Sequence, residues 1–249
     1  MLEIKNLTKK YNNLEKEILS IDEISFTVEK SEFVSIIGPS GCGKSTLLRL
    51  ISGLVEKSEG SILINDLETL RPNKDKGMVF QGFSLFPWLT VEENILFGLN
   101  LNSNISKTKK DEIVNHYLEV TQLEEFRKVY PKSLSGGMQQ RVAIARVLAN
   151  TPQVLLMDEP FGALDSQTRS QMQELLTQIW DKEKMTVLFV THDVAEAVFL
   201  SDRIIVLSKR PAKIKKIFEV PFTRPRSHDL KKNKDFFEFV TKVQEELDF

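Results

Sequence analysis

The stretch Gly38-Pro39-Ser40-Gly41-Cys42-Gly43-Lys44-Ser45-Thr46 decides the fold of this chain. It matches the phosphate-binding loop pattern G-x-x-x-x-G-K-[ST]. A β-type apolar run over residues 33–37 leads into the loop, and a helical run over 47–51 leads out of it. This strand–loop–helix context separates the motif from a glycine-rich turn that happens to carry a lysine. The sequence therefore predicts an α/β fold that binds a nucleoside triphosphate.

Each residue type in the loop has a role in phosphate chemistry. Glycines let the backbone approach phosphate oxygens closely, and the following helix points free N–H groups at them. We expect Lys44 to reach the β- and γ-phosphates and the Ser45 hydroxyl to ligate Mg²⁺. Cys42 is the one cysteine, so an intrachain disulfide is excluded and a reducing compartment fits.

The composition is that of an ordinary globular protein. A 249-residue chain that is 41% hydrophobic can form one large α/β domain or two small ones. Its formal net charge of −1 gives no sign of a nucleic-acid partner. Residues 1–5 lack a signal-peptide core, and no apolar run approaches the ~20 residues that cross a bilayer. If the protein works at a membrane, we expect another chain to span it.

Three short segments predict an antiparallel sheet beside the nucleotide. Residues 2–7 and 24–28 alternate apolar and polar side chains, and residues 61–65 form another short strand. Tyr11 is expected between the first two strands. Its ring can stack on adenine or pack half-buried on the sheet, and its position alone leaves both open.

Aromatic residues follow the predicted strand 77–81, which ends on Gln81. The stretch 83–89 is either core filling or an exposed patch for a partner, and composition alone favours the core. Residues 90–93 form a capping box that opens a helical pattern over 91–130.

Two further turns carry helix-start signals. Ser135 occupies an N-cap position before Gly136 and Gly137, which makes a terminus suited to an anion. A tight turn over 161–165 ends at Asp165 and opens an amphipathic helix.

Carboxylates and a histidine stand at the ends of two predicted buried strands. The run 154–157 ends in Asp158 and Glu159, and the run 186–191 ends at His192. Ligands of open α/β sheets bind at the carboxyl ends of strands. Asp158 is therefore placed to hold Mg²⁺ and Glu159 to polarise a water, the alternative being a solvated acidic turn. For the same reason we interpret His192 as functional rather than structural.

The last forty residues have a basic cluster over 209–216 and a predicted amphipathic helix over 235–247. The basic cluster fits a solvated surface by default, with lipid head groups or a partner as the other interpretation.

In their order along nearly the whole chain, these motifs resemble those of ABC-type ATPases. The Ser135-Gly136-Gly137 signature is the most specific of them. The resemblance implies a phosphate-loop (RecA-like) ABC nucleotide-binding domain with an antiparallel β subdomain and a helical subdomain. It implies an ATPase domain over 1–220, with its helical subdomain at about 82–150, and a C-terminal linker and amphipathic helix over 221–249.

The resemblance also assigns roles residue by residue. The implied catalytic residues are Glu159, His192 and Gln81. The implied Mg²⁺ ligands are Ser45, Gln81 and Asp158. The implied nucleotide contacts are Tyr11, Gly38, Pro39, Ser40, Gly41, Cys42, Gly43, Lys44, Ser45, Thr46, Ser135, Gly136, Gly137 and Asp165. One departure is Met138, where many family members have glutamine; this position borders the signature without supplying its serine or glycine contacts.

Finer features are similar to the ATPases of nitrate, sulfonate and taurine importers. They lie at residues 85–91, 157–165, 187–200, 207–211 and 224–226. This similarity implies a bacterial importer subunit at the cytoplasmic face of the plasma (inner) membrane. There, ATP hydrolysis drives uptake of a small anionic solute of the nitrate, sulfonate, taurine or bicarbonate type. Import of a pyrimidine precursor or a non-transport role are the alternatives.

The implied cofactors are ATP and Mg²⁺, and the implied partners are other transporter subunits. Two ATPase subunits, either copies or paralogues, face each other head to tail. Membrane permease subunits dock at residues 82–90. On this resemblance we expect Phe86 and Trp88 on the docking surface rather than in the core. A solute-binding protein acts indirectly. ABC ATPases of DNA repair or the ribosome usually carry two cassettes or long insertions, and phosphate-loop kinases lack the signature helix.

Overall fold

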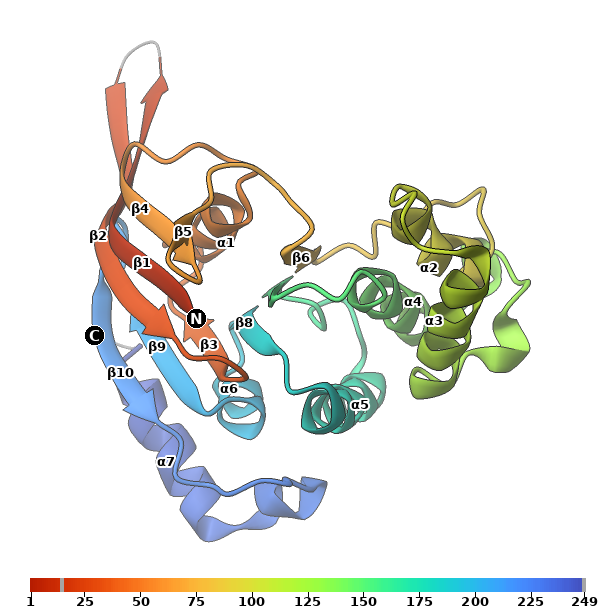
Figure 1. The fold of residues 1–249 in the computed structure, drawn as a ribbon. Helices are drawn as coiled ribbons and strands as arrows, with labels where there is room; N and C mark the ends of the chain where they lie inside the picture. The colour runs from red at the N-terminus through yellow and green to blue at the C-terminus, as the bar shows by residue number, and fades with distance from the viewer. Residues whose placement is uncertain (14–15, 248–249) are drawn as a thin grey trace.

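A computed structural model describes residues 1–13 and 16–247 of the chain. Its centre is a six-stranded sheet in the order β10-β9-β3-β8-β7-β6, in which β10 alone is antiparallel to its neighbour (Figure 1). The bounds of these strands are β3 Phe33–Ile37, β6 Lys76–Val79, β7 Val154–Asp158, β8 Thr186–Val190, β9 Arg203–Leu207 and β10 Ile214–Glu219.

A second, antiparallel sheet has the order β2-β1-β4-β5 and confirms the predicted flanking sheet. Its bounds are β1 Leu2–Asn13, β2 Lys16–Val28, β4 Glu59–Ile64 and β5 Leu67–Glu68. The prediction that Tyr11 lies between strands was wrong, because β1 continues past residue 7 and Tyr11 pairs with Ile18. Register shifts after Ile4 and Leu7 interrupt the apolar alternation without ending the strand.

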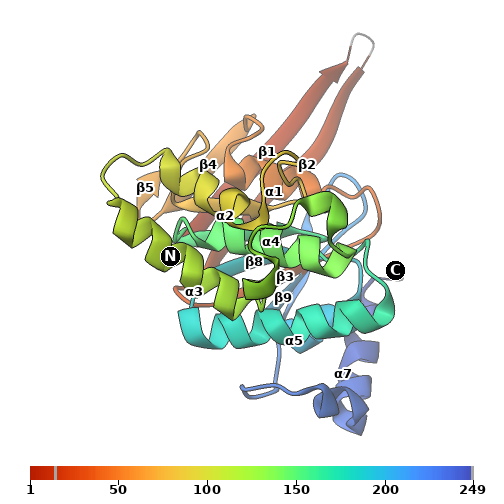
Figure 2. The ribbon, with the colours of Figure 1, turned by 90° about the vertical axis from the view of Figure 1, so that its right-hand side faces the viewer.

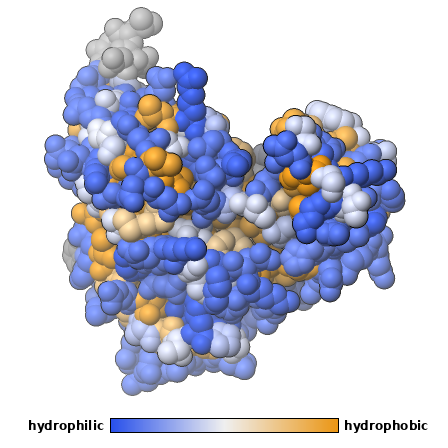
Figure 3. All heavy atoms as spheres, in the orientation of Figure 1, coloured by the Kyte–Doolittle hydropathy of each residue, from blue (hydrophilic) through white to orange (hydrophobic). Residues whose placement is uncertain are grey.

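Helices surround the central sheet and also form a lobe beside it (Figures 1 and 2). The helices are α1 Lys44–Ser52, α2 Val91–Asn100, α3 Lys107–Val120, α4 Gly136–Leu148, α5 Ser166–Glu183, α6 Val194–Leu200 and α7 Lys234–Glu245. Short 3₁₀ turns are η1 Glu124–Phe126, η2 Pro131–Ser133 and η3 His228–Lys232. The lobe contains α2, α3 and α4, and Figure 3 shows the surface hollowed between it and the sheets.

The helical pattern predicted over 91–130 is divided into separate pieces. α2 ends at Asn100, where Asn102 Oδ1 accepts a hydrogen bond from the Asn104 N–H at 3.1 Å and forms a turn. Ser106 then caps α3 by accepting from the Lys109 N–H at 3.3 Å. Local side-chain bonds to the backbone therefore override the apolar periodicity between the two helices.

Both faces of the central strands are buried, which explains their continuous apolar sequence. Along β7, Leu155 and Met157 pack into one hydrophobic cluster with α5 and α6, whereas Leu156 packs into another cluster with α1. Alternate residues of β8 divide between the same two clusters. Only the residues at and beyond the strand ends are thus available for polar chemistry. Among the residues that the structure describes, no helix is both long and apolar enough to cross a membrane.

Replacing Leu155 by alanine tests this packing. Leu155 is fully buried at the centre of the sheet, so we expect Leu155→Ala to lower the free energy of unfolding by about 2–5 kcal/mol through lost burial and a residual cavity. Leu67→Ala is the matched control, because Leu67 is 74% exposed, and its unfolding midpoint in urea is expected to match the parent's. Equal midpoints for the two variants would contradict the assigned packing.

Candidate nucleotide-binding site

The phosphate loop joins the end of β3 to α1, as its sequence predicts. Gly41 and Gly43 have φ angles of 73° and 130°, which residues with a Cβ rarely adopt. Gly43 occupies the N-cap of α1 and makes no side-chain cap, so the start of the helix remains available to an anion. The Cys42 thiol is buried, and burial raises its pKa, so this side chain is packing rather than chemistry.

The Lys44 ammonium is folded back into the loop. Its Nζ donates to the backbone oxygen of Gly38 at 2.8 Å and to that of Pro39 at 3.2 Å. These carbonyls satisfy a charge that is buried with the rest of the side chain. The ammonium is therefore held at the mouth of the loop, where phosphate oxygens can replace the two carbonyls.

Ser45 and Asp158 meet where α1 begins and β7 ends. Ser45 Oγ donates to Asp158 Oδ1 at 2.8 Å. Burial raises the pKa of the Asp158 carboxyl, and the Ser45 hydrogen bond partly offsets this effect. Within the described ranges no three His, Cys, Asp or Glu side chains cluster as a metal cage. A hydroxyl and one carboxylate nevertheless fit Mg²⁺, which takes few protein oxygens and completes its shell with phosphates and water.

The three side chains predicted as catalytic lie together beyond the ends of neighbouring strands. His192 Nδ1 is 2.9 Å from Glu159 Oε2. Glu159 has a φ of 45°, and its N–H donates to the Val190 oxygen at 2.9 Å, which sets the direction of its side chain. Gln81 follows β6, and a Cβ on Gly162 would lie 3.7 Å from its Nε2 and 3.8 Å from Glu159 Oε2. The structure thus brings Gln81, Glu159 and His192 to one place.

The predicted signature residues are held by a different part of the fold. Ser135 caps α4 by accepting from the Met138 N–H at 3.3 Å. A Cβ on Gly137 would lie 2.5 Å from Thr168 Cγ2, so the turn packs tightly against the start of α5. Asp165 caps α5 by accepting from the Thr168 N–H at 3.0 Å, and this bonding lowers its pKa. Ser135, Gly136, Gly137 and Asp165 therefore form a second group, on the start of two helices.

The Tyr11 ring is exposed on β1, with the Lys9 ammonium 4.8 Å from its centroid. Part of the ring surface is therefore available to stack on a base.

The basic cluster over 209–216 is partly neutralised by ion pairs. Lys213 pairs with Asp22 at 2.9 Å and Lys216 pairs with Glu246 at 2.6 Å. These ion pairs tie the cluster to β2 and to the residue after α7.

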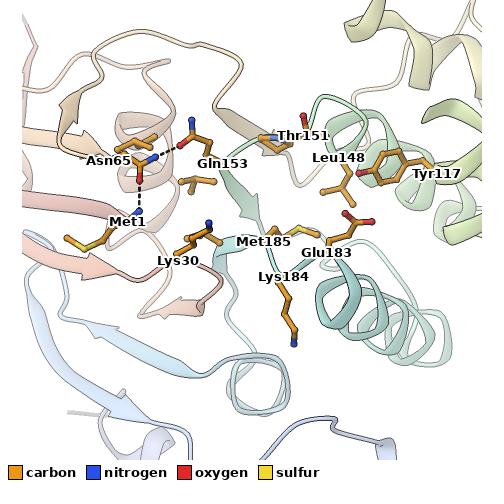
Figure 4. Close-up of a pocket in the computed structure, with 14 residues that line it drawn as sticks. Met1, Lys30, Asn65, Tyr117, Leu148, Thr151, Gln153, Glu183, Lys184 and Met185 are labelled. Atoms are coloured by element: carbon orange, nitrogen blue, oxygen red, sulfur yellow. Dashed lines mark hydrogen bonds between the residues drawn. The ribbon is translucent and has the colours of Figure 1, made fainter. Parts of the chain in front are cut away.

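A separate groove of about 520 Å³ lies at the opposite, amino-terminal ends of β7 and β8 (Figure 4). The Met1 amino group donates to Asn65 Oδ1 at 2.8 Å, and Asn65 Nδ2 donates to Gln153 Oε1 at 2.5 Å. Because Asn65 follows β4 and Gln153 precedes β7, these bonds join the two sheets. The groove lies away from the phosphate loop, and the hydrogen bonds at it hold the two sheets together.

Sequence reasoning missed two buried polar residues near His192. Glu196 on α6 and Gln173 on α5 are almost fully buried and hydrogen-bonded to each other at 2.8 Å. Gln173 lies on the apolar stripe of α5, three and seven residues before Leu176 and Trp180. A polar residue within a buried helical stripe is the signal that would have indicated it.

A phosphate loop, a carboxylate at the adjacent strand end and a second carboxylate bonded to a histidine define a nucleotide-hydrolysing α/β protein. The family model described as ABC transporter matches residues 21–162. An aliphatic sulfonates import ATP-binding protein, SsuB, of Bacillus cereus is 46% identical over 99% of this chain and 95% of its own. An uncharacterised ABC transporter ATP-binding protein of Methanocaldococcus jannaschii is 48% identical over 97% of this chain and 89% of its own.

A solved structure agrees with these relatives. The ATP-binding cassette MJ0796, in a dimeric post-hydrolysis state bound to ADP and Pi, is 36% identical with a TM-score of 0.78 and covers 90% of this chain and 100% of its own. This chain belongs to the ABC transporter family and is an ATP-binding cassette with ATPase function. The predicted ABC fold class, with its antiparallel sheet and helices, is confirmed.

Changing Asp158 tests the electrostatics of the site. Burial raises the folded-state pKa of Asp158 above its unfolded value, so its ionised form costs stability as pH rises through that pKa. We expect Asp158→Asn to raise the urea midpoint of the nucleotide-free chain at about pH 7 and the gain to shrink toward about pH 4. Asp165→Asn is the control. We expect it to lower the urea midpoint at about pH 7, because hydrogen bonds lower the pKa of Asp165 and its ionised form stabilises the fold. A lower midpoint for Asp158→Asn at neutral pH would overturn this account.

Proposed function

We propose that this chain is the ATP-hydrolysing subunit of an importer for a small anionic solute of the sulfonate type, acting at the cytoplasmic face of the membrane. One observation carries the proposal. The hydrogen-bonded pairs Ser45–Asp158 and Glu159–His192 lie next to each other at the sheet edge that carries the phosphate loop. The solute class rests on relatives named aliphatic sulfonates import ATP-binding proteins, which match at 45–48% identity.

In the proposed site, residues 38–46 surround the phosphates and Tyr11 offers its ring to adenine. Lys44 exchanges the carbonyls of Gly38 and Pro39 for phosphate oxygens. Ser45 and Asp158, with Gln81 on the side of the neighbouring Glu159, would hold Mg²⁺, which neutralises the phosphate charge when it is bound. The rearrangement is small, because each side chain already lies at the strand edge and exchanges only its hydrogen-bond partner.

Hydrolysis needs a base that is correctly aimed. Glu159 accepts a proton from the attacking water, and His192, bonded to Glu159, fixes the carboxylate and reaches toward the γ-phosphate. Gln81 lies on the same side as Glu159 and orients the water. Histidine and glutamine thus restrain the carboxylate and the nucleophile in one geometry, which accelerates attack.

A second ATPase subunit completes the proposed site. Ser135, Gly136, Gly137 and Asp165 lie at the starts of α4 and α5, apart from the strand ends that carry Glu159. Two chains arranged head to tail place these residues of one copy on the nucleotide of the other. The dimeric state of the similar cassette MJ0796 supports this arrangement.

Glu159→Gln tests the assignment of the base. We expect the variant to bind ATP with unchanged affinity, because the amide keeps the shape of the carboxylate, and to lose about 100-fold or more of its turnover. ATP binding is measured by fluorescence of a nucleotide analogue and turnover by phosphate release. Glu112→Gln is the matched control on the exposed face of α3, with wild-type turnover expected. Undiminished turnover in Glu159→Gln would refute the base.

The aromatic segment at 83–89 forms part of the proposed permease surface. The core prediction made from composition is wrong for Trp88, which is 70% exposed, whereas Phe83 and Leu85 pack partly against the core. The centroid of the Phe86 ring lies 4.3 Å from the centroid of the Phe97 ring and 5.7 Å from that of the Trp88 ring. Phe86 and Phe97 line a groove of about 970 Å³ beside α2. We infer that this groove and Trp88 receive a helix of the membrane subunit.

One buried side chain gives this surface its shape. Asn94 is fully buried on α2, and its Oδ1 accepts from the Phe86 N–H at 2.9 Å. Its Nδ2 donates to the oxygens of Phe86, Leu89 and Thr90 at 3.2, 3.0 and 2.9 Å. Asn94 therefore fixes the loop before any partner binds, which lowers the entropy cost of docking.

Truncating Trp88 tests the docking surface. We expect Trp88→Ala to weaken co-purification of the native permease about 10-fold or more, because exposed aromatic anchors carry much of an interface's affinity. The ATPase activity of the isolated chain is expected to stay at the parent's level. Phe237→Ala is the control, since Phe237 is an aromatic on α7 that is 59% exposed. Equal permease recovery from both variants would exclude residues 82–90 as the main contact.

The sequence-based division of the chain belongs to the same proposal. Residues 1–220 form the ATPase domain, with the helical subdomain at about 82–150, and residues 221–249 form a C-terminal segment. Support comes from the separate helical lobe and from the place of α7 at the edge of the molecule in Figure 1.

A further inference from the structure

The loop that carries His192 is fixed by buried polar side chains on both sides of the histidine. Thr191 Oγ1 donates to Glu196 Oε2 at 2.5 Å and accepts from the Asp193 N–H at 3.0 Å. Asp193 Oδ1 in turn accepts from the Glu196 N–H at 2.9 Å and caps α6. The backbone from which the imidazole reaches Glu159 is therefore set by Glu196.

Glu196 is connected across α5 to the C-terminal segment. Gln173 Nε2 donates to Glu196 Oε1 at 2.8 Å, and Lys231 Nζ donates to Gln173 Oε1 at 2.5 Å. The Lys231 ammonium also lies 4.4 Å from the centroid of the Phe199 ring on α6. A continuous chain of hydrogen bonds thus runs from η3 to the residue before His192.

The direction of the Gln173 amide is the central feature of this chain. A carboxylate only accepts hydrogen bonds and an ammonium only donates them. Gln173 can satisfy both neighbours in one orientation alone, with its nitrogen toward Glu196 and its oxygen toward Lys231. Without the ammonium, the Gln173 oxygen loses its donor, and Glu196 alone holds the amide in this orientation. A displaced amide would leave a buried carboxylate oxygen unpartnered and would weaken the restraint on Thr191.

The rest of the segment 224–232 holds Lys231 in place. Arg226 is almost fully buried, and its Nη1 donates to the oxygens of Val198, Phe199 and Ser201 at 3.3, 3.1 and 2.7 Å. The His228 ring stacks on Phe199 at 5.4 Å, and its Nε2 is 2.9 Å from the Ser170 oxygen. These contacts fasten the segment to α6 and α5, the two helices that carry Glu196 and Gln173.

We propose that Lys231 is a positioning residue for ATP hydrolysis, which acts through Gln173, Glu196 and Thr191 to hold the His192 loop. The inference rests on the roles proposed above for Glu159 and His192. It assigns to the C-terminal segment an influence on the chemical step rather than on nucleotide binding, because the side-chain network ends at Thr191, next to His192, and includes no side chain of the phosphate loop. Glu196, Arg169 and Glu159 also line one small cavity. A shift of Glu196 would therefore change the surroundings of the Glu159 carboxylate.

Lys231→Met tests the inference, because methionine keeps the packing on Phe199 and removes the donor. In the full-length chain within the intact transporter, we expect kcat for ATP to fall ~10-fold with KM and ATP affinity unchanged, because small displacements of catalytic groups slow chemistry strongly. Lys231→Arg, which keeps a donor, is expected to recover most of the rate. Lys232→Met is the matched control, since Lys232 is 81% exposed and pairs with Asp229, and its rate is expected to be unchanged.

A double variant separates the proposed route from general damage. If Lys231 acts through His192, Lys231→Met adds no further loss in a His192→Ala background. Equal fold-losses in both backgrounds, an unchanged kcat in Lys231→Met, or a loss of ATP affinity alongside kcat would each overturn the inference. A chain in which Glu159→Gln is inactive and Lys231→Met is unaffected overturns this inference alone, whereas an active Glu159→Gln overturns the proposed function.

Discussion

The parallel register of β3, β8, β7 and β6 is the constraint on which the rest of the structure depends. Val190 pairs with both Ile36 and Asp158, and Met157 pairs with Val79. The phosphate loop, Gln81, the Asp158–Glu159 pair and His192 follow these positions and therefore emerge at one edge. Glu159 extends the β7–β8 ladder by one more bond, from its N–H to the Val190 oxygen, so its place follows from the pairing of buried strands.

Several functional side chains at this edge are hydrogen-bonded before any ligand binds. An unpaired buried donor or acceptor costs about 1–3 kcal/mol, and more when it is charged. Lys44 is bonded to loop carbonyls, Ser45 to Asp158, and His192 to Glu159. In the proposed mechanism, nucleotide binding exchanges these partners and does not create new polar positions. The nucleotide-free chain can therefore hold its site in shape, because each side chain is restrained by a bond that a phosphate, a cation or a water later replaces.

The features that sequence predicts well are those that local physics determines. The loop 38–46 and the buried strands follow from glycine placement and apolar runs, and the strand-end residues follow from the parallel topology. The predictions fail where a long-range or side-chain effect decides. β1 continues through Tyr11 because β2 supplies its hydrogen bonds, and Asn102 interrupts an apolar helical period. Trp88 is exposed although composition favours burial, and the contact of Lys231 with Gln173 joins residues 58 positions apart.

α5 connects the two groups of functional residues. Its first turn is capped by Asp165 and packs against Gly137, where an added Cβ would lie 2.5 Å from Thr168 Cγ2, so the starts of α4 and α5 are in close contact. Two turns later the same helix presents Gln173 to Glu196, beside the His192 loop. Arg169, between these points, donates to the Leu164 oxygen at 2.9 Å and ties the turn before Asp165 to the helix. Helices transmit displacement along their axes because their backbone bonds resist stretching. In the proposed dimer, residues that contact the partner's nucleotide and residues that orient the chain's own base thus share one helix. Lys231 contacts this helix at Gln173, on the side of the chain's own base.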